Sequence, residues 1–171
     1  VTGQPMYVWD QNEYAGVMEQ RVMRSDYDAL RRPTSQWLRV GNDVEKEIGR
    51  TVYGESLPSP ETSNLRGQVV MVLGPEGRTE AVAFDFKGSL LESRRQLLAD
   101  ATVHTMDWKS FDETNLSIEV FVQRTQYDAL GRMTRLENWH MVGRTPAIYT
   151  PTYNRRDALE NETLTVSGQV P

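Results

Sequence analysis

The feature that most constrains this chain is a phrase that it writes twice. Residues 27–34 read Tyr-Asp-Ala-Leu-Arg-Arg-Pro-Thr, and residues 127–134 repeat six of those eight positions. Looser copies occupy residues 84–90 and 153–159, so the leading aromatic residues are 57, 43 and 26 residues apart. An uneven interval predicts one recurring turn with insertions between its copies, and it argues against a solenoid of fixed period.

The repeated phrase has the chemistry of a hairpin turn. An aromatic residue (Tyr27, Phe84, Tyr127, Tyr153) ends an incoming strand, and a short side chain that can accept backbone N–H groups follows it (Asp28, Asp85, Asp128, Asn154). Gly88 and Gly131 come where a hairpin loop needs a positive φ. We interpret Arg31 and Arg156 as replacing this glycine in the other two copies, which predicts a different geometry or strain there.

The segments between these turns favour strands. Residues 68–73 and 79–84 are rich in β-forming residues and flank a Gly-Pro-Glu-Gly turn, and residues 117–127 form a long β-branched and aromatic run. The competing prediction is minor helix around 93–99 and 109–114, with residues 13–23 also ambiguous. Residues 54–64 are expected to form a loop, and residues 100–115 an irregular stretch that Trp108 anchors on the sheet. The fold class predicted is all-β, as antiparallel hairpins in a curved sheet.

Composition narrows the classes of function. The chain has 171 residues, enough for one domain, and a net charge of −5, which argues against a general nucleic-acid binder. It has no cysteine, which excludes disulfides, thiol catalysis and cysteine-ligated metals. No stretch is apolar enough to span a membrane. The first residue is Val1 rather than Met, and we expect residues 1–171 to be one segment of a longer chain.

Few residues suggest chemistry. The two histidines, His104 and His140, are 36 residues apart, and we expect structural roles for them; we predict no catalytic residues, no metal and no cofactor. Aromatic faces beside arginines can bind sugars or anions. The candidate ligand surface drawn from the four tryptophans (9, 37, 108, 139) and the arginine pairs (31–32, 94–95, 155–156) consists of Trp37, Trp139, Arg94 and Arg95. Packing and solvated strand ends are the alternative for these residues.

The run Tyr-Asp-Ala-Leu-Gly-Arg-Met-Thr at 127–134 resembles the YD repeat of the Rhs family. The resemblance extends to Tyr53-Gly54-Glu55, to residues 64–69, to residues 84–97 and to Tyr153-Asn154 before Leu159-Glu160, and it covers roughly residues 20–168. These phrases are most similar to the Rhs-type region of the B/C components of bacterial insecticidal toxin complexes.

This resemblance implies a non-catalytic segment of a hollow β-shell that encapsulates a C-terminal toxin until delivery. Its partners would be other YD repeats of the parent chain and a partner toxin subunit or the cargo, in a secreted or cell-surface protein. The alternative is a YD-repeat module that binds carbohydrate or a toxin subunit. Because a sheet cut from a shell has two unpaired edges, the segment is also expected to dimerise through them.

Overall fold

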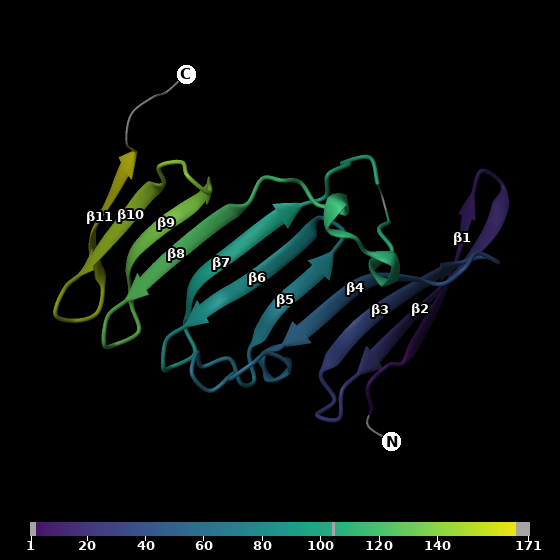
Figure 1. Ribbon diagram of the computed structural model, residues 1–171, viewed down its shortest axis with the longest axis horizontal. Coiled ribbons are helices and arrows are strands. Elements are labelled where there is room, and N and C mark those ends of the chain that lie inside the picture. The colour runs from purple at the N-terminus through teal and green to yellow at the C-terminus, as the bar shows by residue number, and fades with distance from the viewer. Residues whose placement is uncertain (1–2, 104, 167–171) are drawn as a thin grey trace.

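The structure, a computed structural model, describes residues 3–103 and 105–166, which form one sheet of eleven antiparallel strands. Strand order in the sheet is the order of the sequence, so each strand pairs with the one before it (Figure 1). The all-β prediction is confirmed. The strands are β1 Tyr7–Tyr14, β2 Val17–Tyr27, β3 Pro33–Val40, β4 Lys46–Tyr53, β5 Val69–Gly74, β6 Gly77–Phe84, β7 Leu90–Leu97, β8 Phe121–Tyr127, β9 Met133–Met141, β10 Ala147–Tyr153 and β11 Leu159–Val166.

Short turns fix the hairpins. Ala15 and Gly16 both have positive φ (50° and 77°), as the tightest two-residue hairpin turns require, so residues 13–23 form a hairpin and not a helix. Pro75 and Glu76 connect β5 to β6, and Gly77 follows with φ 132°. A Cβ at Gly77 would come within 2.2 Å of the Gln96 carbonyl oxygen, because β7 packs directly alongside.

The helix predicted at 93–99 is wrong. Residues 93–97 belong to β7, where Ser93 is buried and donates its hydroxyl to the Glu80 carbonyl of β6 at 3.1 Å. The apolar spacing at residues 90, 91, 97 and 98 fits a helix face, but hydrogen bonding to β6 and β8 on both sides decides the conformation. Near 109–114 the chain makes only single 3-10 turns, η2 Trp108–Ser110 and η3 Glu113–Asn115.

All connections between strands fall on two edges of the sheet, the turn edge and the far edge. The turn edge carries the four Tyr-Asp-type turns and the 54–68 loop, which begins with the 3-10 turn η1 Gly54–Ser56; its loops are 28–32, 54–68, 85–89, 128–132 and 154–158. The far edge carries loops 15–16, 41–45, 75–76, 98–120 and 142–146. The turn edge is the lower edge of the sheet in Figure 1.

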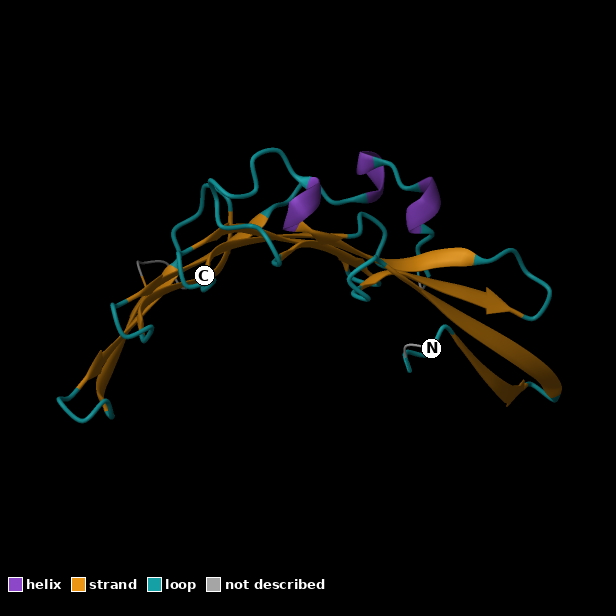
Figure 2. Ribbon diagram, turned by 90° about the horizontal axis from the view of Figure 1, so that it is seen from below, coloured by secondary structure: helices purple, strands orange, loops and turns teal. Residues whose placement is uncertain are grey.

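The sheet is arched, and the 3-10 turns lie on its convex side (Figure 2). Loop 98–120 packs there, on the face that we call the loop face, and Trp108 is only 1% exposed in a cluster with Leu73 and Leu116. The loop is pinned to β4, because Asp107 accepts the Glu47 N–H at 3.1 Å and Arg50 donates to the Trp108 carbonyl at 3.0 Å. Trp108 therefore anchors this irregular stretch, as predicted.

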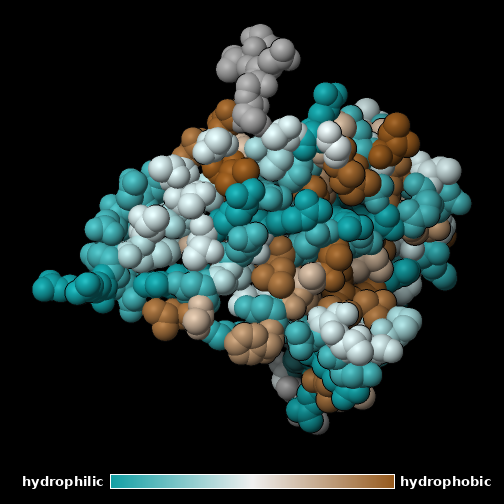
Figure 3. All heavy atoms as spheres, turned by 60° about the vertical axis from the view of Figure 1, so that its left-hand side comes forward, coloured by the Kyte–Doolittle hydropathy of each residue, from teal (hydrophilic) through white to brown (hydrophobic). Residues whose placement is uncertain are grey.

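The two ends of the sheet are strands with one free side among the described residues. On β1, Tyr7 stacks on Trp9 with ring centroids 5.8 Å apart, and both rings are exposed. On β11, Leu164 and Val166 are exposed, and Figure 3, which brings the C-terminal strands forward, shows hydrophobic groups interspersed among hydrophilic ones. Among the described residues, none of the helical segments has the length and apolar character that crossing a membrane requires.

Candidate functional site

The four repeated turns share one backbone geometry. In the first, the Asp28 N–H donates to the Arg32 carbonyl at 3.0 Å, and the Arg31 N–H donates back to the Asp28 carbonyl at 2.9 Å. The same two bonds recur, at 2.9–3.1 Å, in the turns that begin at Asp85, Asp128 and Asn154. One turn type therefore serves all four copies, although their sequences and the intervals between them differ.

The side chain after the aromatic residue closes each turn. Asp85 Oδ1 accepts the Lys87 and Ser89 N–H groups, both at 2.8 Å, and Asp128 Oδ1 accepts the N–H groups two and four residues on. Asn154 Oδ1 accepts the corresponding pair in the fourth turn. Backbone donors stabilise the charged carboxylate, which lowers the pKa of Asp85, and the Arg32 N–H does the same for Asp28. For Asp128 the Arg132 side chain is the main cause of its lowered pKa.

The lowered pKa values of these aspartates predict that the fold loses stability in acid. A carboxyl group whose pKa is lower in the folded chain stabilises the fold when the pH is above the pKa of the unfolded chain, 3.8. This stabilisation is lost as the pH falls through the lower pKa of the folded chain. We expect the melting temperature to fall steeply below about pH 4. In Asp128→Asn the fall should be smaller, because one of the titrating groups is gone. Thermal melts from pH 7 to pH 2 test this, and equal pH dependence in both proteins would contradict it.

The fourth residue after each aromatic has left-handed backbone geometry. It is Arg31, Gly88, Gly131 and Asp157, with φ of 65°, 83°, 81° and 61°. The assignment of Arg156 to this position is wrong, because Asp157 holds it. Of the two outcomes expected for turns without glycine, a different geometry is not seen, because the hydrogen bonds are the same in all four. At Arg31 and Asp157 the left-handed backbone conformation is strained, because both residues have a Cβ atom that glycine lacks.

This strain predicts opposite effects for two exchanges. Arg31→Gly should stabilise the chain by about 0.5 kcal/mol, since glycine adopts positive φ freely but also gains freedom in the unfolded chain. Gly131→Arg, at the equivalent position, should destabilise it by about 1 kcal/mol. Urea unfolding of both variants measures the difference, and changes of the same sign would contradict the shared turn geometry.

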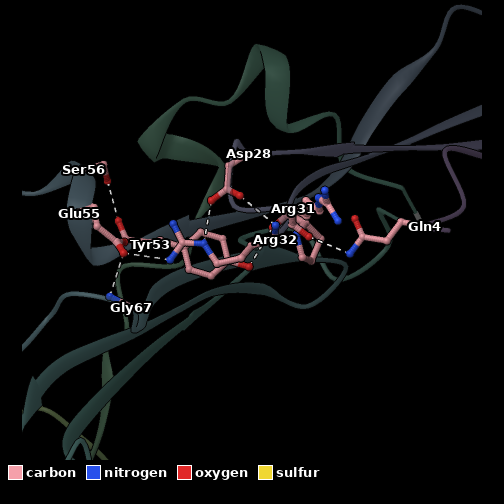
Figure 4. A network of polar contacts seen from close by, with 9 residues as sticks. Gln4, Asp28, Arg31, Arg32, Tyr53, Glu55, Ser56 and Gly67 are labelled. Carbon is pink, nitrogen blue, oxygen red and sulfur yellow. Dashed lines mark hydrogen bonds and ion pairs between the residues drawn. The ribbon is translucent and has the colours of Figure 1, made fainter. Parts of the chain in front are cut away.

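Contacts between neighbouring hairpins complete the site, and the first lies around Arg32 (Figure 4). The guanidinium is held by Asp28 at 2.7 Å and Glu55 at 3.0 Å, and it lies over the ring of Tyr53, 3.9 Å from the centroid. The Tyr53 hydroxyl donates to the Pro33 carbonyl at 3.1 Å. We call this arrangement a clasp, because it joins the start of β3 to the end of β4.

A second clasp repeats the first around Arg132. Asp128 holds its guanidinium at 2.7 Å and Asp157 at 2.6 Å, and the group lies 4.9 Å from the centroid of Tyr153. The Tyr153 hydroxyl donates to the Met133 carbonyl at 3.0 Å. The β9–β10 ladder has only two paired positions, so this clasp supports the junction where the ladder is shortest.

The clasps bridge junctions that no loop closes. On the turn edge β3 is not connected to β4, nor β9 to β10, because their loops lie on the far edge. The second turn has Ser89 in place of the arginine, and there Lys87 donates to the Ala129 carbonyl of the next turn instead. The first turn is tied to the N-terminal residues, since Gln4 donates to the Arg31 carbonyl at 2.8 Å.

Sequence reasoning missed the partners in these clasps: Arg32, Arg132, Tyr53, Glu55 and Asp157. A signal existed, because Tyr27 to Tyr53 and Tyr127 to Tyr153 are both 26 residues, and each interval has arginine five residues after its first tyrosine. Two strands with their two turns fill 26 residues, which brings the second tyrosine beside the first turn.

The structure does not assemble the candidate ligand surface. Arg95 stacks on Trp139, 5.1 Å from its ring, but Arg94 points to the other face, where it binds Glu92 at 2.7 Å. Trp37 lies apart on β3, and its indole N–H is committed to Asp26 at 2.7 Å. Only Trp139 and Arg95 therefore share a surface.

Metal-binding and histidine chemistry find little support in the described part of the chain. Within it, no three His, Asp or Glu side chains are grouped to hold a metal ion. The ring of His140 is hydrogen-bonded through Nδ1 to the Asn138 carbonyl at 2.7 Å. His104 lies outside the described residues.

Turns, clasps and strand order together define an open sheet of Tyr-Asp hairpins, and solved structures share the fold of this sheet. The crystal structure of TcdB2-TccC3 matches with a TM-score of 0.71 and 20% identity over 89% of this chain. The crystal structure of TcdB2-TccC3-Cdc42 matches with a TM-score of 0.73 and 17% identity over 98% of this chain. The structure of the Photorhabdus luminescens Tc holotoxin pore matches with a TM-score of 0.72 and 20% identity over 89% of this chain. These similarities show the fold, and the chain spans less than a tenth of the length of those chains. No family model and no curated protein matches the sequence.

Proposed function

We propose that this chain is a structural segment of the wall of a YD-repeat toxin shell, which encloses a C-terminal cargo until delivery. The observation that carries the proposal is a single arched sheet in which, among the described residues, β1 and β11 each have one free side. Such a sheet is one stretch of a longer wall, and the sequence resemblance and the fold shared with Tc toxin structures support the same origin. The whole protein would then be secreted or displayed at the cell surface.

The concave face of the arch, which we call the open face, has the character of a lining. No element covers it within the described residues (Figure 2). A row of paired residues crosses it from β4 to β9: Thr51, Val72, Thr79, Arg95, Phe121 and Met141. This mixture of apolar and polar groups can contact an unfolded chain without holding it tightly, as an enclosing wall requires.

A binding module for carbohydrate or a toxin subunit is the alternative. It would use Trp139, which is 37% exposed on the open face, with Arg95 beside it. The Trp139 ring alone offers a sugar only a small stacking surface, because Trp37 lies apart on β3 and Arg94 lies on the other face of the sheet. The wall is therefore the better-supported function.

Electron cryomicroscopy of the complete gene product that contains this segment tests the proposal. We expect a closed shell in which these eleven strands form part of the wall, and a protease-resistant segment inside it. A compact particle with no enclosed space would overturn the shell. A glycan array probed with the native chain and with Trp139→Ala tests the alternative, which requires glycan binding that the variant loses.

The free strand edges also lead us to propose that the isolated chain self-associates. Unpaired N–H and C=O groups on β1 and β11 can pair with strands of another copy. Sedimentation velocity at high concentration should give dimers or larger species. A strictly monomeric chain would contradict this expectation.

A further inference from the structure

The two loop-bearing edges of the sheet differ in charge. The loops of the turn edge carry seven basic and six acidic residues, whereas the far-edge loops carry eight acidic residues and only two basic ones. Basic and acidic residues of the strands cancel, so the net charge of −5 derives from the far edge. The asymmetry follows the hairpin layout, because alternate loops fall on opposite edges.

On the turn edge the carboxylates are engaged internally. Asp85 accepts backbone N–H groups, while Asp28, Asp128 and Asp157 hold the clasp arginines. Of the five other basic side chains of this edge, Arg66 pairs with Glu61, whereas four form no ion pair within the described residues: Arg31, Lys87, Arg155 and Arg156. The charged groups of this edge without an ion pair are therefore mostly basic, and its loops have a net charge of +1 against −6 for the far-edge loops. It also exposes the apolar tips of three turns, Leu30, Phe86 and Leu130, of which Phe86 is 83% exposed.

On the far edge, by contrast, most carboxylates of the described residues form no ion pair. Among the described residues, ion pairs engage only Glu45 and Glu113 of its carboxylates. The carboxylates left without an ion pair there are Asp43, Glu76, Asp100, Asp107, Asp112 and Glu119. Of these, Asp100, Asp107 and Asp112 accept backbone N–H groups, as Asp85 does on the turn edge, and no basic side chain neutralises them within the described residues. Apolar tips accompany them, since Ile118 is 98% and Val44 84% exposed, with Val142 nearby on the same edge.

We infer that the turn edge of one copy docks against the far edge of a second copy. The two edges are complementary in charge, and each presents apolar side chains that contact would remove from water. A head-to-tail contact of this kind repeats, so copies stack side by side into a broader surface. The inference deepens the proposed function and rests on it for its biological role, since a wall needs contacts between neighbouring strips.

This contact differs from strand pairing at the ends of the sheet. β1 and β11 each carry two acidic residues and no basic one. Joining β1 to β11 of another copy therefore depends on backbone hydrogen bonds formed against like charges, and not on charge complementarity. Edge stacking and strand pairing consequently respond to different substitutions.

A charge-swap experiment on the 171-residue chain tests the inference. One variant, Arg155→Glu/Arg156→Glu, makes the turn edge acidic, and a second, Asp43→Arg/Glu119→Arg, makes the far edge more basic. Each alone should associate about tenfold more weakly than the native chain, and an equimolar mixture should recover native affinity because opposite edges again match. Sedimentation velocity gives the association constants.

A matched control separates local complementarity from total charge. Arg39→Glu/Arg135→Glu makes the same change in net charge on strands β3 and β9, and it should alter association much less than the turn-edge variant. If the control weakens association equally, or if the mixture does not recover, the inference is wrong.

Site-specific cross-linking adds a geometric readout, because the chain has no cysteine of its own. Copies carrying Leu30→Cys mixed with copies carrying Ile118→Cys should be joined by a bismaleimide as mixed dimers, in excess over Leu30–Leu30 dimers. Equal yields of both would overturn the inference. Such a result leaves the shell proposal intact, since that proposal fails only if the complete gene product encloses no space.

Discussion

Replacing Trp108 with alanine should destabilise the chain by about 3–5 kcal/mol, the largest effect expected from one side chain here. Trp108 is 1% exposed, and it packs against Leu73 of β5 and Leu116, with Phe111 at 5.2 Å between ring centroids. Its loss leaves a cavity between the loop and the sheet. Urea unfolding gives the free energy, and hydrogen exchange should show residues 98–120 opening first.

Two controls make the result specific. Trp139→Ala removes the same kind of side chain at a half-exposed position and should cost about 1 kcal/mol. Trp108→Phe should fall between them, because the buried indole Nε1 has no hydrogen-bond partner to lose within the described residues. If Trp108→Ala and Trp139→Ala cost the same, the loop is not anchored as we describe.

Gly54→Ala should destabilise the chain by about 3 kcal/mol, through overpacking rather than through a cavity. Gly54 begins η1 directly after the clasp tyrosine Tyr53, and its N–H donates to the Gln68 carbonyl at 2.9 Å. An added Cβ would come 1.9 Å from the Leu65 carbonyl oxygen, which is backbone and cannot move aside without opening loop 54–68. Chemical denaturation measures the loss.

Gly49→Ala is the matched control for this exchange. Gly49 lies on the same strand, β4, and a Cβ there would meet its nearest atom at an ordinary 3.5 Å. We expect little change, or slight stabilisation, since alanine has less conformational freedom in the unfolded chain. A loss equal to that of Gly54→Ala would mean that the close approach of Leu65 is not the cause.

Local sequence predicted the turns better than the helices. All the hydrogen-bonding groups that a turn needs lie within five consecutive residues, as Asp85 to Ser89 illustrates. Residues 93–97 failed because their apolar spacing suits either conformation, and the partner strands that decide between them are remote in sequence.

The four residues of the candidate ligand surface are divided between places in the sheet for a related reason. Residue type alone suggested that Trp37 and Trp139 act together. The strand on which each tryptophan lies, and the face of the sheet that it occupies, depend on how the strands pair. Even the adjacent pair Arg94 and Arg95 is divided, since neighbouring residues on a strand point to opposite faces. The clasps were missed although the two 26-residue tyrosine intervals are visible in the sequence. These intervals predict a contact only once the order of the strands is known.

By itself the sequence determined the strands near 68–73 and 79–84, the four turns and the anchoring role of Trp108, because these depend on groups close together in the chain. Only the tertiary structure decided which hairpins are clasped, which residues share a face, and how charge divides between the two edges. In an antiparallel sheet alternate loops fall on opposite sides, so residues far apart in sequence, such as Arg32 and Glu55 or Arg132 and Asp157, meet only when the strands pair in register.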